Sequence, residues 1–350
     1  MSSLENHRRV SLRDVAKAVG VSVSAVSLAI RNSPRVSAGM RQKIQDKLRE
    51  MDYQPDPMLS ALSHYRRSKG GHPVSAELAW LNCWPVPKKL RSYREFELYW
   101  QGAFDEAKNC GFRLEEFRLA ECKTPARLEA VLRARNIRGL LIPPHGGALD
   151  LHWGDFHWAD FCLIRFGHSV AHPRAHLVTS DQLTDGLMAF ENIWNQGYRR
   201  IAYVTTRGTA TKGTRFSAGF LQGQLKVRAR AQLPPLLLED ENLPPPDRDK
   251  LVSWLRKARP DAILTDISCL PTVLNQCGYQ VPGDIGLAVT SVLDGNASAG
   301  IDQNSREIGK AAVQMLISLI NHNERGIPEI CRELLIEGRW AGGDTLPPKQ

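Results

Sequence analysis

The residue types that could do chemistry in this 350-residue sequence are concentrated at its N-terminal end, where they could bind negative charge. Residues 1–71 carry 13 Lys and Arg against 6 Asp and Glu, which is +7 of the net charge of +9. The rest of the chain is nearly neutral. A cationic segment of this kind suits a polyanion such as nucleic acid. A solvated basic tail is the alternative, but it would lack the helical periodicity and the helix caps found here.

Motifs for catalysis, metal binding or cofactor binding are missing from the sequence. The seven cysteines are scattered and never spaced C-x-x-C, so we expect neither a structural zinc nor a disulfide framework. There is no H-E-x-x-H, G-x-S-x-G or G-x-x-x-x-G-K-[ST] motif, and G-T-A-T-K-G from Gly208 has the wrong spacing for a phosphate loop. We therefore expect a protein that is not an enzyme and holds no cofactor. The alternative, an enzyme with a nucleic-acid-binding head, has no motif to support it.

Length and hydropathy predict a soluble chain with more than one domain. A chain of 350 residues suits a small domain followed by a two-lobed α/β body. No apolar run approaches the roughly 20 residues that span a bilayer. The N-terminal residues M-S-S-L-E-N-H-R-R-V lack the apolar core of a signal peptide. We expect a cytoplasmic protein without membrane contact.

Three short helices are predicted in the first fifty residues. Ser11 can cap the first helix, with Asp14 three residues later in a capping-box position, and Gly20 supplies the turn that ends it. Ser22 and Ser37 can cap the second and third helices. The residues expected to face inward are Leu12, Val15, Ala16, Val19, Val26, Ile30, Met40, Ile44, Leu48 and Met51. Two short helices joined by a glycine-containing turn form a helix-turn-helix, and the charge favours DNA over a protein-docking role.

These motifs resemble the DNA-binding headpiece of the LacI/GalR family of repressors. The matching stretches are V-S-L-R-D-V-A at residues 10–16, G-V-S-x-x-x-V-S at residues 20–27, R-V-S at residues 35–37 and M-D-Y-Q-P at residues 51–55. The resemblance implies a homodimer that binds a pseudo-palindromic double-stranded DNA operator. It also implies control by a small-molecule effector, which we expect to be a carbohydrate.

The resemblance places the second helix in the major groove and assigns the contacts there. Base-reading positions hold Val23, Ser24 and Leu28, and positions that meet phosphates hold Ser11, Ser22, Ser27, Arg35 and Ser37. The remaining DNA-contacting positions hold Leu12, Ala25, Arg31, Tyr53, Leu59 and Leu62. Leu28 stands where many members have Arg, and leucine can contact only apolar edges such as a thymine methyl. The operator sequence therefore does not carry over from the family, although Arg31 could take the missing role.

Residues 53–63 read Y-Q-P-D-P-M-L-S-A-L-S and predict a short hinge helix. Asp56 can cap it, and Pro57 suits its first position. In the family such a helix folds on the operator, and Leu62 falls at the position of a leucine wedge that enters the minor groove. A plain linker with incidental leucines is the alternative. We expect a helix-turn-helix domain at residues 1–56, a hinge and linker at 57–71, and an effector-binding and dimerisation domain at 72–350.

Beyond residue 76, apolar strand candidates alternate with amphipathic helices. The expected strands are Leu78–Leu81, Gly139–Ile142, Phe161–Ile164, Ile201–Val204, Ala262–Leu264 and Gly286–Val289. The expected helices are Phe96–Cys110, Leu183–Gln196, Phe216–Val227 and Ser305–Ile320. The fold class is therefore α/β, with parallel sheets covered by helices on both faces. The resemblance implies a two-lobed periplasmic-binding-protein-like body, with chain crossings near residues 168–175, residues 291–300 and the C-terminus.

Ligands of open α/β sheets bind beyond the carboxyl ends of the strands. The residues at such ends that we expect to bind the effector are Asn82, Trp84, His145, Arg165, Arg215, Asp266, Ser291 and Asp294. Arg215 matches the family position whose arginine commonly holds the effector, and Trp84 could stack on a sugar face. Ser291 stands where the family usually has Asp, a role that Asp294 could take.

The sequence therefore predicts a transcription regulator, most simply a repressor of the LacI type controlled by a sugar-like effector. An architectural or constitutive DNA-binding protein with a non-sensing body is the alternative. Nothing in the sequence fixes the sign of regulation, so activation stays open.

Overall fold

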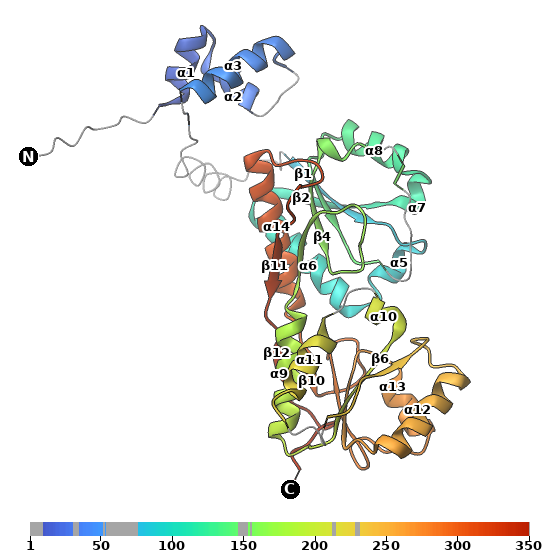
Figure 1. The fold of residues 1–350 in the computed structure, drawn as a ribbon. Helices are drawn as coiled ribbons and strands as arrows, with labels where there is room; N and C mark the ends of the chain where they lie inside the picture. The colour runs from blue at the N-terminus through green and yellow to red at the C-terminus, as the bar shows by residue number, and fades with distance from the viewer. Residues whose placement is uncertain are drawn as a thin grey trace, which may run out of the picture. The chain divides into compact units, whose positions relative to one another are not determined.

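The computed structural model describes residues 10–30, 35–51, 53, 76–145, 153–154, 156–211, 215–227 and 232–349. The chain divides into two compact units, Met1–Pro73 and Val74–Gln350, each of which is taken by itself below. Figure 1 shows the helices of the first unit in blue and the layered α/β second unit in the remaining colours.

The first unit contains the three predicted helices, α1 (Leu12–Val19), α2 (Val23–Ile30) and α3 (Ala38–Glu50). Ser11 and Asp14 form the predicted capping box at the start of α1: the Ser11 amide donates to the Asp14 carboxylate at 2.8 Å, and the Asp14 amide donates to the Ser11 hydroxyl at 3.3 Å. Gly20 ends the helix at a φ of +76°, a conformation that glycine adopts without strain.

The core of this first unit is small. Its buried side chains are Val15, Ala16, Val26, Ala29, Val36 and Ile44. Leu48 and Met51 pack against this core as expected, whereas Met40 is 36% exposed, which corrects its predicted inward orientation. Met40 lies in the first turn of α3, one turn before the buried Ile44.

The second unit is built from two mainly parallel sheets, one in each lobe, which confirms the predicted fold class. The first sheet has the order β11-β5-β4-β3-β1-β2, and its strands are β1 (Ala76–Asn82), β2 (Phe112–Arg118), β3 (Gly139–Ile142), β4 (Cys162–Phe166), β5 (His176–Ser180) and β11 (Glu333–Ile336). The second has the order β12-β10-β9-β8-β6-β7, and its strands are β6 (Ile201–Thr206), β7 (Leu236–Leu238), β8 (Ala262–Thr265), β9 (Gly286–Val289), β10 (Gly300–Asp302) and β12 (Arg339–Ala341). Each described pairing is parallel except that of β10 with β12.

Helices cover both faces of each sheet (Figure 1). Those of the first lobe are α5 (Pro87–Leu90), α6 (Arg94–Asn109), α7 (Leu119–Cys122), α8 (Pro125–Ala134), the 3-10 turn η1 (Trp158–Asp160) and α14 (Ser305–His322). Those of the second lobe are α9 (Gln182–Asn195), α10 (Arg207–Thr211), α11 (Phe216–Gln224), α12 (Pro245–Ala258) and α13 (Leu270–Gln276). The helix α14, far along the chain, therefore completes the first lobe rather than the second.

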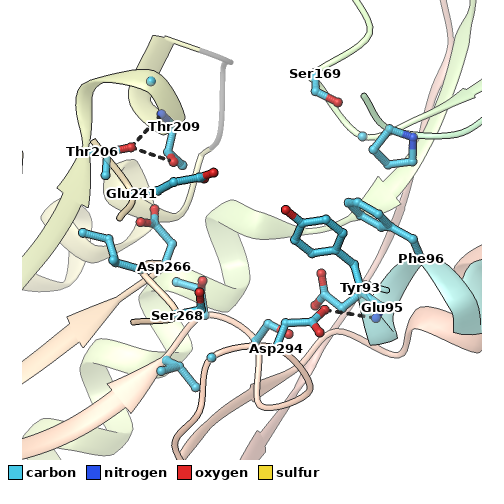
Figure 2. A pocket seen from close by; sticks show the side chains of 18 of the residues that line it. Tyr93, Glu95, Phe96, Ser169, Thr206, Thr209, Glu241, Asp266, Ser268 and Asp294 are labelled. Carbon is cyan, nitrogen blue, oxygen red and sulfur yellow. Dashed lines mark hydrogen bonds between the residues drawn. The ribbon is translucent and has the colours of Figure 1, made fainter. Parts of the chain in front are cut away.

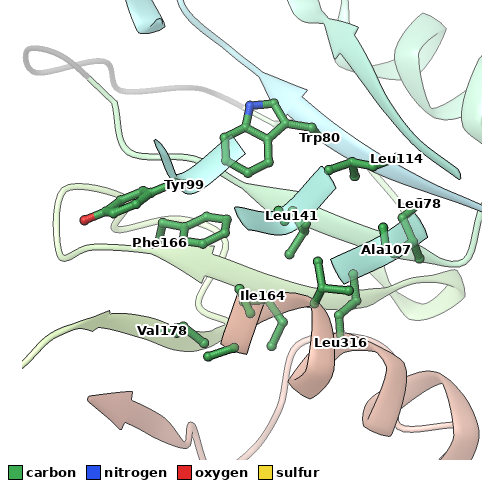
Figure 3. Close-up of a cluster of buried hydrophobic side chains, with 14 of the residues drawn as sticks. Leu78, Trp80, Tyr99, Ala107, Leu114, Leu141, Ile164, Phe166, Val178 and Leu316 are labelled. Atoms are coloured by element: carbon green, nitrogen blue, oxygen red, sulfur yellow. The ribbon is translucent and has the colours of Figure 1, made fainter. Parts of the chain in front are cut away.

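The core under α6 and α14 holds the first lobe together (Figure 3). Trp80 of β1 packs edge-on against Trp100 and tilted against Phe166, at centroid distances of 5.5 and 5.1 Å. The two helices approach so closely that a Cβ on Gly102 would overlap the backbone of Arg306. Small residues at this contact allow α14 to return to a sheet whose strands β1 to β5 lie more than 120 residues earlier.

The chain crosses between the lobes at positions that differ from those expected. The first crossing follows β5 near Asp181, the second follows β10 near Gln303, and the third lies between β11 and β12, near Glu337. The expected crossings at residues 168–175 and 291–300 were too early. The strands β5 and β10 had escaped sequence recognition because they are only partly apolar, and each adds one more strand before the chain leaves its lobe.

Hydrogen bonds tie the three crossing segments together. The Ser180 hydroxyl donates to the Gln303 side chain at 2.8 Å, and the Asn304 side chain donates to the Glu337 carbonyl at 2.7 Å. The buried carboxyl group of Asp185 accepts from the Gly338 amide at 2.9 Å. Burial raises the pKa of Asp185 to about 7, and the Gly338 amide offsets part of that rise. These bonds make the crossings a compact hinge between the lobes.

Candidate functional site

The surface of the first unit presents the start of α2. Ser22 caps this helix, since its hydroxyl accepts from the Ala25 amide at 3.1 Å, and it also shares a hydrogen bond of 2.9 Å with Ser24. Val23, at the first position of the helix, is 40% exposed although it is apolar. An exposed valine and hydroxyl groups at a helix start can contact base edges and phosphate oxygens.

The other predicted DNA-contacting residues differ in how far their side chains are buried. Ser11, Arg35 and Ser37 are exposed, and Ser37 caps α3 by accepting from the Met40 amide at 3.4 Å. The side chains that are partly buried are Leu12, Ala25, Ser27, Leu28 and Tyr53. Arg31, Leu59 and Leu62 lie outside the described residues. Leu28 packs against the core in part, so its available surface for a base is smaller than that of Val23.

A cleft with a volume of about 900 Å³ lies between the two lobes of the second unit. It opens at the carboxyl ends of parallel strands from both sheets. The residues that follow these strands and line it include His145 after β3, Gly167 after β4, Asp266 after β8 and Ser291 after β9. This is the location at which open α/β folds bind ligands.

The wall from the first lobe is aromatic (Figure 2). Tyr93 and Phe96 face the cleft, and the ring of Tyr93 lies 5.8 Å from that of Trp84. Trp84 is only 3% exposed, and its indole N–H already donates to the Pro144 carbonyl at 2.9 Å. The tryptophan predicted to stack on a ligand therefore lines the cleft mainly as a fixed apolar surface, and Tyr93 and Phe96 were missed by sequence reasoning.

The wall from the second lobe is polar and acidic (Figure 2). Its hydroxyl groups come from Thr206, Thr209, Ser268 and Ser291, and its carboxyl groups come from Glu239, Asp240, Glu241, Asp266 and Asp294. The residues Glu239–Asn242 had no strand signal before them, because β7 is only three residues long. Sequence reasoning therefore missed this acidic loop.

The imidazole of His145 lines the cleft and has no hydrogen-bond partner among the described residues. The side chain is 6% exposed, and neither ring nitrogen has a hydrogen-bond partner within the described part of the chain. Burial lowers the pKa of His145 to about 4, so the ring is neutral at pH 7. A neutral imidazole has one donor and one acceptor, and the described residues use neither of them.

Two carboxyl groups in the cleft are also incompletely paired. The Asp266 oxygen Oδ2 accepts from the hydroxyls of Thr205 at 2.7 Å and Tyr203 at 3.0 Å, whereas Oδ1 is buried without a partner among the described residues. The oxygen Oε1 of Glu95 is likewise buried without a hydrogen-bond partner among the described residues. Burial raises the pKa of Glu95 to about 7, partly offset by the Ser291 hydroxyl beside it, and burial raises that of Asp266 to about 6.

Asp294 connects the two lobes across the floor of the cleft. Its carboxylate accepts from the amides of Arg94 at 2.9 Å and Glu95 at 3.1 Å, the first two residues of α6. Figure 2 shows Asp294 beside Glu95. The residue before them, Tyr93, provides no side-chain cap, so a carboxylate from the other lobe caps this helix instead. Asp294 therefore acts in this structure as a contact between the lobes.

We expect Asp294→Ala to loosen this contact between the lobes. Loss of a charged cap costs about 0.5–2 kcal/mol, and the amides of Arg94 and Glu95 lose their partner. Hydrogen exchange measured by NMR or mass spectrometry should accelerate at the start of α6. Exchange in the middle of α12, which does not contact Asp294, serves as the internal control, and unchanged protection at Arg94 and Glu95 would contradict the cross-lobe role.

Three of the eight predicted effector-binding residues lie outside the lining of the cleft. Asn82 is fully buried and donates to Glu116 and to the Pro87 carbonyl, so it supports the turn after β1. The Arg165 guanidinium donates to the carbonyls of Gly167, Val170 and Ala175 and so orders its own loop.

Arg215 is the most consequential of the three, since it was the favoured ligand-binding residue. Its guanidinium pairs with Glu333 at 3.0 Å, at the edge of the first sheet, and its amide donates to Gln182. The carboxylate of Glu333, which follows α14 in the chain, could not be matched to Arg215 from sequence. The five predicted residues that do line the cleft are Trp84, His145, Asp266, Ser291 and Asp294.

Two domain models match the chain. The model of bacterial regulatory proteins of the lacI family matches residues 11–56, and that of the periplasmic binding protein-like domain matches residues 190–339. The second match falls on the unit that contains the cleft. Within the described residues, no helix is long and apolar enough to cross a membrane.

Curated relatives match in the same order of domains. The HTH-type transcriptional regulator DegA of Bacillus subtilis is 41% identical over 58 residues, which is 17% of this chain and 17% of that protein. The HTH-type transcriptional repressor PurR of Mannheimia succiniciproducens is 22% identical over 93% of this chain and 97% of its own length. The HTH-type transcriptional regulator MalR of Streptococcus pneumoniae is 25% identical over the same shares.

Solved structures share the fold at low identity. A complex of the transcriptional regulator CelR with cellobiose has a TM-score of 0.56 and 17% identity over 96% of this chain and 100% of that one. The lac repressor dimer bound to operator and the anti-inducer ONPF has a TM-score of 0.53 and 17% identity over 97% and 100%.

A helix-turn-helix followed by a two-lobed α/β body with a cleft defines the class of this protein as a DNA-binding transcription regulator. The chain carries a lacI-type helix-turn-helix domain at residues 11–56 and a periplasmic-binding-protein-like domain at residues 190–339, and its curated relatives are HTH-type transcriptional regulators.

Proposed function

We propose that this regulator is a homodimeric repressor whose operator binding is controlled by a small sugar-like molecule held in the cleft between its lobes. The observation that carries the proposal is the set of buried polar groups left without partners on the cleft surface, those of His145, Glu95 and Asp266. Buried polar groups are normally hydrogen-bonded, and a ligand that supplies the partners would recover that cost.

The two walls of the cleft suit a polyhydroxylated molecule. Aromatic rings on one side offer an apolar surface, and hydroxyl and carboxyl groups on the other accept and donate hydrogen bonds. The solved complex of CelR holds cellobiose, which supports this class of ligand. A ligand that contacts both walls would bind the closed arrangement better than an open one and so shift the equilibrium between them.

The proposed DNA contacts rest on the resemblance and on exposure. Ser22, Val23 and Ser24 present the start of α2 to the major groove, and Ser11, Ser27, Arg35 and Ser37 reach phosphates. Leu62 would act as a wedge in the minor groove, as in the family. We further propose the helix-turn-helix domain at residues 1–56, the hinge and linker at 57–71 and the effector-binding and dimerisation domain at 72–350.

We expect selection from a random DNA pool to yield a pseudo-palindrome, because two identical headpieces related by a two-fold axis read two half-sites. The selected DNA then serves as the probe for fluorescence anisotropy with a carbohydrate library, and at least one sugar should change the operator affinity at least about fivefold. Sedimentation should give a dimer on the DNA. A monomer bound tightly to one half-site would contradict the dimer.

An architectural DNA-binding protein with a non-sensing body is distinguished in the same experiment. It would bind the selected DNA with an affinity that no sugar in the library alters, and titration calorimetry with those sugars would give no heat of binding.

A further inference from the structure

The charged groups that line the cleft are mainly negative. Carboxyl groups from six residues line it, and they belong to Glu95, Glu239, Asp240, Glu241, Asp266 and Asp294. Among the lining residues that the structure describes, Lys89 is the one Lys or Arg. The two arginines predicted at the site, Arg165 and Arg215, lie outside the lining and have other partners. The guanidinium groups that would balance these carboxylates are therefore absent from the described lining.

Most of these carboxyl groups have no cation near them. Glu239 is paired with Arg207 at 3.0 Å and with Lys250 at 3.9 Å. In the described ranges the other five form no ion pair. Glu241 is exposed at the cleft and its side chain makes no hydrogen bond there either. A negative field therefore extends into the space that a ligand would occupy.

Two of these five lining residues each have a buried carboxyl oxygen without a hydrogen-bond partner among the described residues. These are Oε1 of Glu95 and Oδ1 of Asp266, one on the floor and one on the second-lobe wall (Figure 2). Burial raises the pKa of both groups, which means that it destabilises their ionised forms by more than the neighbouring hydroxyl groups stabilise them. A donor with a positive charge would supply both the missing hydrogen bond and the missing charge.

The remaining lining is compatible with a cation. His145 is buried and neutral at pH 7, so it adds hydrogen bonding without a competing positive charge. Tyr93 lies in the field of Glu241 and Asp294, which together with burial raises the pKa of its phenol. The rings of Trp84, Tyr93 and Phe96 present surfaces that can attract a cation through their π electrons.

We infer that the cleft takes a polyhydroxylated ligand that carries an ammonium group, such as an amino sugar, in preference to a neutral or an acidic sugar. This inference rests on the proposed function of effector binding and specifies its ligand class. A neutral sugar can donate hydroxyl hydrogens to these carboxylates but leaves their charges uncompensated. A sugar acid or sugar phosphate brings further negative charge and is repelled.

The test compares matched sugars that differ in one group. Titration calorimetry of the full chain at pH 7 and low ionic strength would use D-glucosamine, D-glucose and D-glucuronate, and the β-1,4-linked glucosamine disaccharide against cellobiose. We expect each amine to bind about tenfold or more tightly than its neutral counterpart, and glucuronate to bind most weakly. Raising the salt concentration should reduce the amine preference, because exposed charges are screened.

Two isosteric variants test the residues. Glu241→Gln removes the charge of an exposed side chain without a hydrogen bond, so the fold should be unaffected. Asp266→Asn keeps an acceptor for the hydroxyls of Tyr203 and Thr205. Each should weaken amine binding about tenfold and neutral-sugar binding much less. Asp249→Asn, an exposed carboxylate of the same lobe outside the cleft, is the matched control and should change neither.

The outcomes separate this inference from the proposed function. Neutral sugars that bind as tightly as their amines, or more tightly, overturn the inference and leave effector sensing in place. Amine binding that survives both variants unchanged also overturns it, since the carboxylates would then not be responsible. If no sugar of any charge binds while the selected operator is still bound, the sensing function fails as well.

Discussion

Replacing Ile44 with alanine is expected to abolish most operator binding while leaving the second unit intact. Ile44 is fully buried in a core of six side chains. Loss of such a side chain costs about 2–5 kcal/mol, which is as much as a domain of this size has to spare, about 3–5 kcal/mol. The headpiece should be largely unfolded, and with two headpieces in the proposed dimer the affinity for the selected operator should fall on the order of 100-fold.

Fluorescence anisotropy with the selected operator measures this loss, and circular dichroism follows the helices. Met40→Ala is the matched control, because Met40 lies one turn earlier in the same helix and is 36% exposed. Its operator affinity should stay within about twofold of the parent. Tight operator binding by Ile44→Ala would show that the headpiece does not depend on this core.

The second large effect concerns salt and the basic end of the chain. Residues 1–71 hold +7 of the net charge of +9, and phosphate neutralisation by Lys and Arg releases counterions from DNA. Between 50 and 200 mM salt, the operator affinity should fall by about 10³-fold if each dimer makes at least six such contacts. Anisotropy titrations at four salt concentrations give the slope.

Removal of residues 1–71 is the companion experiment. The second unit, with its own cores in both lobes, should stay folded and retain calorimetric ligand binding, whereas DNA binding should be lost. Operator binding by the fragment, or a flat salt dependence of the full chain, would assign the DNA contacts to a different part of the protein.

The headpiece could be predicted almost completely from the sequence because its determinants are local. A capping serine, an acidic residue three positions later and a glycine in the turn act within one or two helical turns. The structure confirms the capping box of Ser11 and Asp14 and the helix end at Gly20. Met40 was placed wrongly because helical spacing gives the face on which a residue lies but not how deeply each position on that face is buried.

In the second unit, element type was predictable and the path between the lobes was not. The six expected strands are present, since buried parallel strands read as continuous apolar runs. The strand β2, F-R-L-E-E-F-R, was missed because it lies at an edge and alternates with charge. The short strands β5 and β10 were missed too, and the crossings were consequently placed several residues early.

The candidate ligand site, too, could be predicted from the sequence only in part. The residues after β3, β8 and β9 line the cleft, because strand ends meet at one edge of a parallel sheet, and their contact with an effector stays a prediction. The pairing of Arg215 with Glu333 could not be foreseen, since it joins residues 118 positions apart, and it removes the favoured cation from the cleft. Asp294 was expected to hold a ligand, and the structure instead pairs it with the first amides of α6.

The sequence by itself therefore determined the class of this protein: the helix-turn-helix, the concentration of positive charge beside it and the alternating α/β body. Each of these depends on periodicity, caps or composition, which act over short distances along the chain. Only the tertiary structure decided the character of the cleft, with one aromatic wall, one acidic wall and no arginine in its described lining. The physical reason is that the electrostatics of a site depend on which charges are brought together or paired elsewhere, and those pairings form between residues far apart in the chain.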